Sequence, residues 1–175
     1  MQMEGYKTFH KGMKNRYGKP FKEGNVYQIE GPLKFGNDGN GFHFCMRLED
    51  TLRYFPAMEE EVDIAKVSAL GELEEYKDEY YGYYDMFCTN IIQINHVMTR
   101  EEIIKMFLDM PEYRVVRFIS GFHLTKEEIE LFRLRYASSE NIQDAISYYQ
   151  EGKTDTYEKK IEDYKKKVYT NRKKN

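Results

Sequence analysis

The apolar pattern of this 175-residue chain changes near Thr99, and this change constrains the fold more than any other feature. The segment before it, Ile91–Val97, is rich in β-branched residues and predicts a strand. The segment that follows, Thr99-Arg100-Glu101-Glu102, is a capping box and predicts the start of a helix. We therefore expect an α+β protein. A β-rich domain, residues 1–97, is followed by a helical subdomain, residues 98–175, and the two pack as one unit.

Strand-like patterns recur through the N-terminal half. Stretches of β-branched and aromatic residues bounded by turn formers predict strands at 6–10, 26–29, 42–45 and 62–70. An amphipathic helix is expected at 48–55, and a basic loop at 15–24. The tyrosine-rich stretch 72–88 has no clear period, so we expect a helix or a loop whose rings cover the sheet.

Helix start and stop signals recur through the C-terminal half. Pro111 suits the first turn of a helix that stops at Gly121, and a second capping box begins at Thr125. Ser138 or Ser139 can cap the next helix. A basic terminal helix from Thr154 is expected to bury its apolar stripe on the body or on a second copy, as in a dimer; the stripe is Tyr157, Ile161, Tyr164 and Val168.

Charge is distributed unevenly along the chain, although the net charge is only −3. Residues 35–85 hold thirteen acidic and four basic residues, whereas residues 1–34 and 153–175 are net basic. An acidic block of this kind is either a solvated surface that the rest of the fold balances or a face that meets a basic partner.

The sequence does not favour a membrane-spanning, secreted, disulfide-rich or metal-binding protein. No apolar run is long enough to span a bilayer, and the N-terminal segment lacks the apolar core of a signal peptide. Cys45 and Cys88 do not form a disulfide framework, so we expect a reduced, cytoplasmic protein. The four histidines are far apart and no metal-ligating, phosphate-loop or serine-elbow motif is present, so no metal is expected. Cys45 near His43 is a weak signal for a thiol nucleophile, against a buried structural cysteine.

A glycine-rich segment at 36–71 carries the most distinctive motif. Gly36, Gly39 and Gly41 permit close backbone approach, so they form either a ligand cradle or only a turn. The segment resembles the core signature of ADP-ribosyltransferase-like domains of the poly-ADP-ribose polymerase branch. The resemblance rests on Gly41-Phe42-His43-Phe44, the helix 48–55, Val67-Ser68-Ala69-Leu70-Gly71 and a strand at 89–94, and covers roughly residues 5–97. It implies a split sheet of that family's type and a nicotinamide nucleotide site.

The catalytic identities of that family are altered in this chain. Tyr6-Lys7-Thr8 stands where the family offers His-Gly-Ser/Thr, and His43 stands where it offers a stacking tyrosine. Asn90 aligns with the glutamate that supports the transferring ribose, and a neutral amide cannot stabilise a developing positive charge as a carboxylate does. The resemblance therefore implies a reduced or repurposed site, with Thr8, His43 and Asn90 as the catalytic residues only if the protein is an enzyme.

The chain is also similar to an uncharacterised family of small phage and prophage proteins. The shared motifs are Gly5-Tyr6-Lys7-Thr8-Phe9, Gly41-Phe42-His43-Phe44-Cys45 and Ala69-Leu70-Gly71. This resemblance implies a phage or prophage origin and a bacterial host, but no activity.

Our first functional hypothesis is a phage-encoded accessory protein without catalysis and without a cofactor. It would bind and inhibit a host protein such as a defence nuclease, in an anti-CRISPR-like role, because an acidic surface can fill a basic nucleic-acid channel. The partner-binding candidates are Glu59, Glu60, Glu61, Glu74, Glu75, Asp78, Glu79, Tyr80, Tyr81 and Tyr84.

Two alternatives remain. One is an enzyme that uses NAD, with Thr8, His43 and Asn90 around the nicotinamide and His10 as an additional donor. The other is a nucleic-acid-binding module, which the acidic net charge disfavours. Its signal is a run of basic residues interleaved with rings: Lys7, Lys11, Lys14, Arg16, Lys19 and Lys22 with Tyr6, Phe9, Tyr17 and Phe21.

Overall fold

A computed structural model describes residues 2–36, 38–55, 57–76 and 86–152. The chain divides into two compact units, Met1–Lys105 and Met106–Asn175, with the boundary inside helix α2 (Arg100–Phe107). The N-terminal unit holds the sheet and the C-terminal unit holds helices, which confirms the predicted α+β class. The predicted terminal helix from Thr154 lies outside the described residues.

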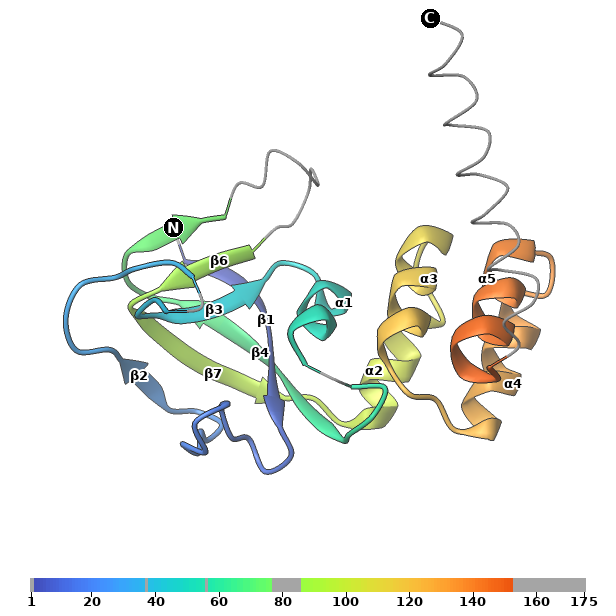
Figure 1. Ribbon diagram of the computed structural model, residues 1–175, viewed down its shortest axis with the longest axis horizontal. Coiled ribbons are helices and arrows are strands. Elements are labelled where there is room, and N and C mark those ends of the chain that lie inside the picture. The colour runs from blue at the N-terminus through green and yellow to red at the C-terminus, as the bar shows by residue number, and fades with distance from the viewer. Residues whose placement is uncertain (1, 37, 56, 77–85, 153–175) are drawn as a thin grey trace, which may run out of the picture. The chain divides into compact units, whose positions relative to one another are not determined.

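Seven strands of the described residues form one antiparallel sheet, in the order β2-β7-β4-β1-β3-β6-β5 (Figure 1). Their bounds are β1 Met3–His10, β2 Val26–Gln28, β3 Phe42–Cys45, β4 Val62–Ala69, β5 Leu73–Glu75, β6 Met86–Thr89 and β7 Ile91–Val97. Every strand predicted from the alternating pattern is present, to within a few residues at its ends.

The stretch 72–88 was predicted as a helix or a loop, and this prediction is wrong at both ends. β5 and β6 occupy them and pair with each other, Leu73 opposite Thr89 and Glu75 opposite Phe87. A three-residue strand at the edge of a sheet needs no buried face, so it leaves no alternating pattern in the sequence. The strand expected at 89–94 is also interrupted, because the chain bends at Asn90 between β6 and β7.

Side chains pack on both faces of the sheet within the N-terminal unit. One face carries an apolar cluster in which three phenylalanine rings, Phe9, Phe21 and Phe44, pack with alanine and valine side chains of β4 and with isoleucine side chains of β7. On the other face, helix α1 (Leu48–Thr51) packs against β1 and β3 and continues into the 3₁₀ turn η1 (Leu52–Tyr54). The predicted helix 48–55 is therefore a short α-helix that tightens into a 3₁₀ turn.

The helices of the C-terminal unit begin where the capping residues predict. Their bounds are α3 Glu112–Gly121, α4 Lys126–Arg135, α5 Glu140–Ala145 and the π turn η2 Ile146–Gln150. Thr125 caps α4 in a complete capping box with Glu128, and Ser139 caps α5. The rings of Phe107 and Phe118 stack at 3.9 Å between centroids within a buried aromatic cluster. No helix among the described residues is both long enough and apolar enough to cross a membrane.

Candidate functional site

The candidate site lies where strands β1 and β3 separate. The two strands share one register pair, Tyr6 opposite Cys45. Figure 1 shows β1 and β3 running in different directions over part of their length. Continuing the same register would place Thr8 opposite His43, but no such pair forms. Gly5 allows β1 and β3 to approach closely at this pair, since a Cβ at Gly5 would lie 2.5 Å from the Cys45 carbonyl oxygen.

A cleft of about 590 Å³ occupies the gap between the diverging strands, a volume suited to a small ligand. Its described lining includes three cationic side chains, Lys7, Arg16 and Lys19, and only one carboxylate, Glu30. The aromatic side chains of the lining are Phe9, Tyr17, Phe21, Phe35, Phe42, Tyr54 and Phe55. A cavity with rings and excess positive charge suits a ligand that has both a planar group and an anionic group.

Thr8 lines the cleft, but its hydroxyl is already engaged. The Thr8 and Thr51 hydroxyl oxygens lie 2.5 Å apart, and the Thr51 hydroxyl donates to the Leu48 carbonyl at 2.7 Å. Because a threonine hydroxyl has a single proton, Thr8 is the donor in the bond with Thr51. Thr8 is also only 2% exposed, so it ties β1 to α1 and has no proton left for a ligand.

His43 lines the same cleft and is held as a neutral ring. Its Nε2 accepts a hydrogen bond from the Gly36 N–H at 3.3 Å, which requires the tautomer with the proton on Nδ1. Burial, with smaller contributions from the charges of Lys7 and Arg16, lowers the pKa of His43 to about 4. Phe35 packs edge-on against the imidazole at 4.8 Å between centroids, so the ring is fixed in place.

Asn90, the third predicted catalytic residue, is not among the residues that line the cleft. Its side-chain oxygen accepts from the Glu72 N–H at 2.7 Å, and its backbone oxygen accepts from the Ile29 N–H at 3.0 Å. Asn90 thus holds two turns together. Thr8 and His43 meet at one cleft and Asn90 does not. His10, the predicted additional donor, lines the cleft and has its Nδ1 2.9 Å from Glu60.

The glycine-rich segment contributes one wall of the cleft. Gly36, Gly39 and Gly41 all line it, so the segment is part of a ligand-sized cavity and also a turn. Gly41 has a φ of +158° and packs tightly, because a Cβ there would lie 2.3 Å from the Cys88 sulfur.

The basic and aromatic run at 6–22 also folds into the wall. Lys7, Phe9, Arg16, Tyr17, Lys19 and Phe21 line the cleft, whereas Lys11, Lys14 and Lys22 do not. The basic and aromatic residues of this run therefore marked the site in the sequence. Read as a linear run, they were interpreted as the mark of a nucleic-acid-binding module. The lining positions Phe35, Tyr54 and Glu30 come from other segments and had no such signal.

The described acidic partner-binding candidates are exposed and lie in two places. Glu59, Glu60 and Glu61 precede β4, whereas Glu74 and Glu75 belong to β5. Three strands separate β4 from β5, or ~19 Å at the usual spacing between strands. Glu60 contacts His10, and Glu74 accepts from the Phe35 N–H at 2.9 Å. The remaining candidates, Asp78, Glu79, Tyr80, Tyr81 and Tyr84, lie outside the described residues.

The two cysteines are buried thiols on neighbouring strands. Cys45 is 2% exposed and Cys88 is 0% exposed. Burial, followed by the nearby charge of Glu74, raises the pKa of Cys88 to about 11, so this thiol stays protonated. The geometry favours the structural interpretation over a thiol nucleophile.

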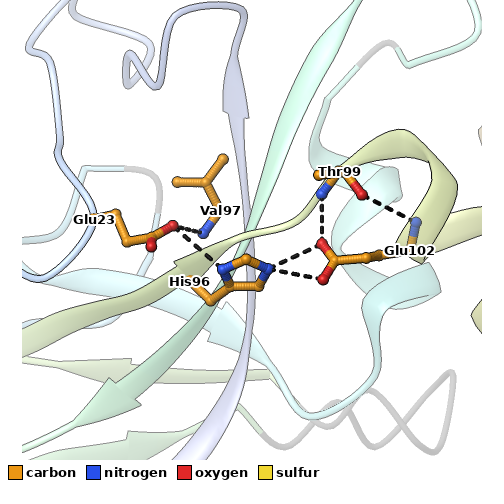
Figure 2. A network of polar contacts seen from close by, with 5 residues as sticks. All are labelled: Glu23, His96, Val97, Thr99 and Glu102. Atoms are coloured by element: carbon orange, nitrogen blue, oxygen red, sulfur yellow. Dashed lines mark hydrogen bonds and ion pairs between the residues drawn. The ribbon is translucent and has the colours of Figure 1, made fainter.

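A second polar cluster lies away from the cleft, around His96 (Figure 2). Its Nε2 lies 2.9 Å from the Glu102 carboxylate and its Nδ1 lies 3.3 Å from that of Glu23. Glu102 also accepts from the Thr99 N–H at 2.7 Å, which completes the predicted capping box of α2. The cluster joins a loop, the end of β7 and the start of α2. No group of three metal-ligating side chains occurs among the residues that the structure describes.

Comparison with known proteins gives one match. No curated protein and no solved structure matches the chain. A family model described as a domain of unknown function, DUF7666, matches residues 3–106, which include all seven strands and the whole lining of the cleft. Because this match covers more than half of the chain, the protein belongs to the DUF7666 family.

Proposed function

We propose that this protein binds a nucleotide-class ligand in the cleft between β1 and β3, with NAD as the first candidate. The observation that carries the proposal is the lining: aromatic rings, three cationic side chains and a single carboxylate around about 590 Å³. Rings stack on a base or a nicotinamide, and the cations face phosphates. The resemblance to ADP-ribosyltransferase-like domains supports the same ligand class.

Binding without ADP-ribosyl transfer is the form of this function that we favour. Asn90 stands at the position that the resemblance assigns to the catalytic glutamate, and it holds turns instead of lining the cleft. The one carboxylate in the described lining is Glu30, which is exposed. We therefore expect NAD to bind and to remain intact.

Titration calorimetry with NAD, ADP-ribose, AMP and nicotinamide tests the proposal. We expect binding of the phosphate-bearing ligands, and a loss of about tenfold or more in affinity for Arg16→Ala, since a bond to a charged group contributes roughly 1.5–3 kcal/mol. Lys14→Ala is the matched control, because Lys14 is exposed in the same loop and does not line the cleft. Failure of every nucleotide to bind would overturn the proposal, and release of nicotinamide from NAD would overturn its non-catalytic form.

The second candidate function is a phage-encoded inhibitor of a host defence protein. The observation that favours it is the exposure of all five described acidic candidates, Glu59, Glu60, Glu61, Glu74 and Glu75. Glu59 and Glu75 suit a test because Glu60 and Glu74 make internal contacts whose loss would disturb the fold.

Plasmid retention in bacteria that carry a plasmid-targeting CRISPR nuclease provides that test. The wild-type protein should preserve the plasmid, and the double variant Glu59→Lys, Glu75→Lys should not. An unaffected double variant, or a wild-type protein without effect, would count against an acidic contact surface.

A further inference from the structure

Lys7 is a lysine on the apolar face of the sheet. Along β1 its side chain lies on the same side as Gly5 and Phe9, because alternate residues of a strand share a face. Phe9 is fully buried in the apolar cluster, and the Lys7 amine lies 5.5 Å from the centre of the Phe9 ring. Lysine is rarely placed on a core-facing position unless it is paired or functional.

The charge of Lys7 has no carboxylate partner among the described residues. The amine donates to the His43 carbonyl oxygen at 2.7 Å, and Lys7 forms no ion pair with any residue that the structure describes. Burial, partly offset by the neighbouring thiols Cys45 and Cys88, lowers the pKa of Lys7 to about 8. In a substantial fraction of the molecules, Lys7 then carries a neutral, nucleophilic amine near physiological pH.

Lys7 is also half-buried and lines the cleft. Lys7 lines it together with Arg16 and Lys19, so an anionic ligand would be drawn towards the same cavity. The other nucleophiles nearby are less suitable, because Cys45 and Cys88 are buried.

We propose that Lys7 is a nucleophile that forms an imine with an anionic aldehyde held in the cleft. The amine nitrogen attacks the carbonyl carbon, a C=N bond replaces the C=O bond, and the carbonyl oxygen leaves as water with the two amine protons. No oxidant or reductant is needed, and the step reverses on hydrolysis. This inference shares the cleft with the proposed nucleotide function but does not depend on nucleotide being the natural ligand.

Pyridoxal 5′-phosphate is a suitable probe because it joins an aldehyde, a ring and a phosphate in one molecule. The full-length protein is incubated with it at pH 8 and reduced with borohydride, which converts the imine into a stable secondary amine. Cleavage after Glu4 separates Lys7 from the α-amino group, whose ordinary pKa of about 8 makes it reactive too. Fragment masses then assign the label among the lysines of the peptide.

We expect Lys7 to carry about tenfold or more label than Lys11, because Lys7 lines the cleft and its pKa is lowered, whereas Lys11 does not line the cleft. Lys11 is the matched control because it is exposed and lies 3.3 Å from the Asp63 carboxylate. Labelling of Lys7 should rise between pH 7 and pH 9. Lys7→Arg and Lys7→Met should remove this label and leave that on Lys11 unchanged.

The outcomes separate the two proposals. Selective labelling of Lys7 without protection by AMP or NAD supports the nucleophile and counts against a nucleotide site. Nucleotide binding by calorimetry, with label spread evenly over surface lysines, overturns the nucleophile and leaves the nucleotide site standing. Equal labelling of Lys7 and Lys11 in a folded wild-type protein, as judged by circular dichroism, overturns the inference by itself.

Discussion

The two edges of β1 form different contacts with the strands beside them. Along one edge, β1 pairs with β4 through all eight of its residues, from Met3 opposite Ala69 to His10 opposite Val62. Along the other edge, it shares one register pair with β3 before the strands diverge. Where pairing continues, backbone groups satisfy one another and small side chains fill the core. Where pairing stops, the side chains of Lys7, Thr8 and His43 occupy the space, and a cleft forms.

The largest expected effect comes from a substitution that forces β1 and β3 apart where they pair. Gly5→Val places a Cβ 2.5 Å from the Cys45 carbonyl oxygen and 2.7 Å from the Phe44 ring. We expect a loss of about 3 kcal/mol in the free energy of unfolding, measured by urea denaturation, together with loss of ligand binding.

Gly18→Ala is the control for that substitution. A Cβ at Gly18 meets nothing within 4 Å, and only its φ of +79° opposes the change. We expect this control to lose about 1 kcal/mol. Equal losses for the two variants would mean that the close approach of β1 and β3 at Gly5 does not matter.

The next largest effect concerns the neutral imidazole of His43, which lines the cleft between β1 and β3. Because the folded pKa of His43 is about 4, below the ordinary value of 6.5, the unfolded chain binds the proton more readily. The resulting stability is fully present above pH 6.5 and is lost as the pH falls towards 4. We expect wild type to lose about 2 kcal/mol more than His43→Gln across this window, measured as unfolding free energy against pH. Parallel curves would contradict a buried neutral ring.

A smaller effect is expected for Thr8→Val, which tests whether Thr8 has a structural role or binds the ligand. Thr8→Val removes the donor to Thr51 and should cost about 1 kcal/mol of stability. Affinity for nucleotide should change by less than about twofold, because the Thr8 hydroxyl has no proton left for a ligand. A large loss of affinity in a stably folded variant would show that Thr8 contacts the ligand after all.

The smallest effect lies away from both edges, at the start of α2. The Thr99 N–H, followed by the His96 ring, lowers the pKa of Glu102. This contribution to stability is present above the ordinary glutamate pKa, about 4.3, and is lost as the pH falls through the lower folded value. Wild type and Glu102→Gln should therefore differ in unfolding free energy at pH 6 and converge at strongly acidic pH. A difference that persists in acid would exclude the carboxylate as its source.

The sequence predicted the helices and strands that are specified by neighbouring residues, such as a capping side chain or a run of β-branched residues. Thr99, Thr125 and Ser139 start helices because their side chains satisfy N–H groups within the first turn. The β-branched residues of β4 and, more clearly, of β7 also predicted their strands, since both strands bury at least one face. β5 was missed because a short exposed edge strand is held by backbone pairing, and β6 was missed because its four residues, which pair with both β3 and β5, are too few to show a period.

The candidate site was only partly predictable, because contacts between residues distant in the sequence decide which side chains reach the cleft. Two predicted residues, Thr8 and His43, do reach the cleft, and the glycines 36, 39 and 41 line it. The hydroxyl of Thr8 is nevertheless taken by Thr51, which is 43 positions away in the sequence. Asn90 was placed by alignment to a motif, and its contacts with Glu72 and Ile29 depend on how two turns meet.

The sequence by itself determined the α+β class, the positions of the caps and the residues that carry charge and rings in the run 6–22. Periodicity, capping and composition are properties of neighbouring residues, so they are present in the chain before it folds. Only the tertiary structure decided that β1 and β3 part after one pair, that the basic run becomes the wall of a cleft, and that Lys7 is half-buried with no ion pair to a described carboxylate. These outcomes depend on contacts between distant segments, and burial of an amine arises only when those segments meet.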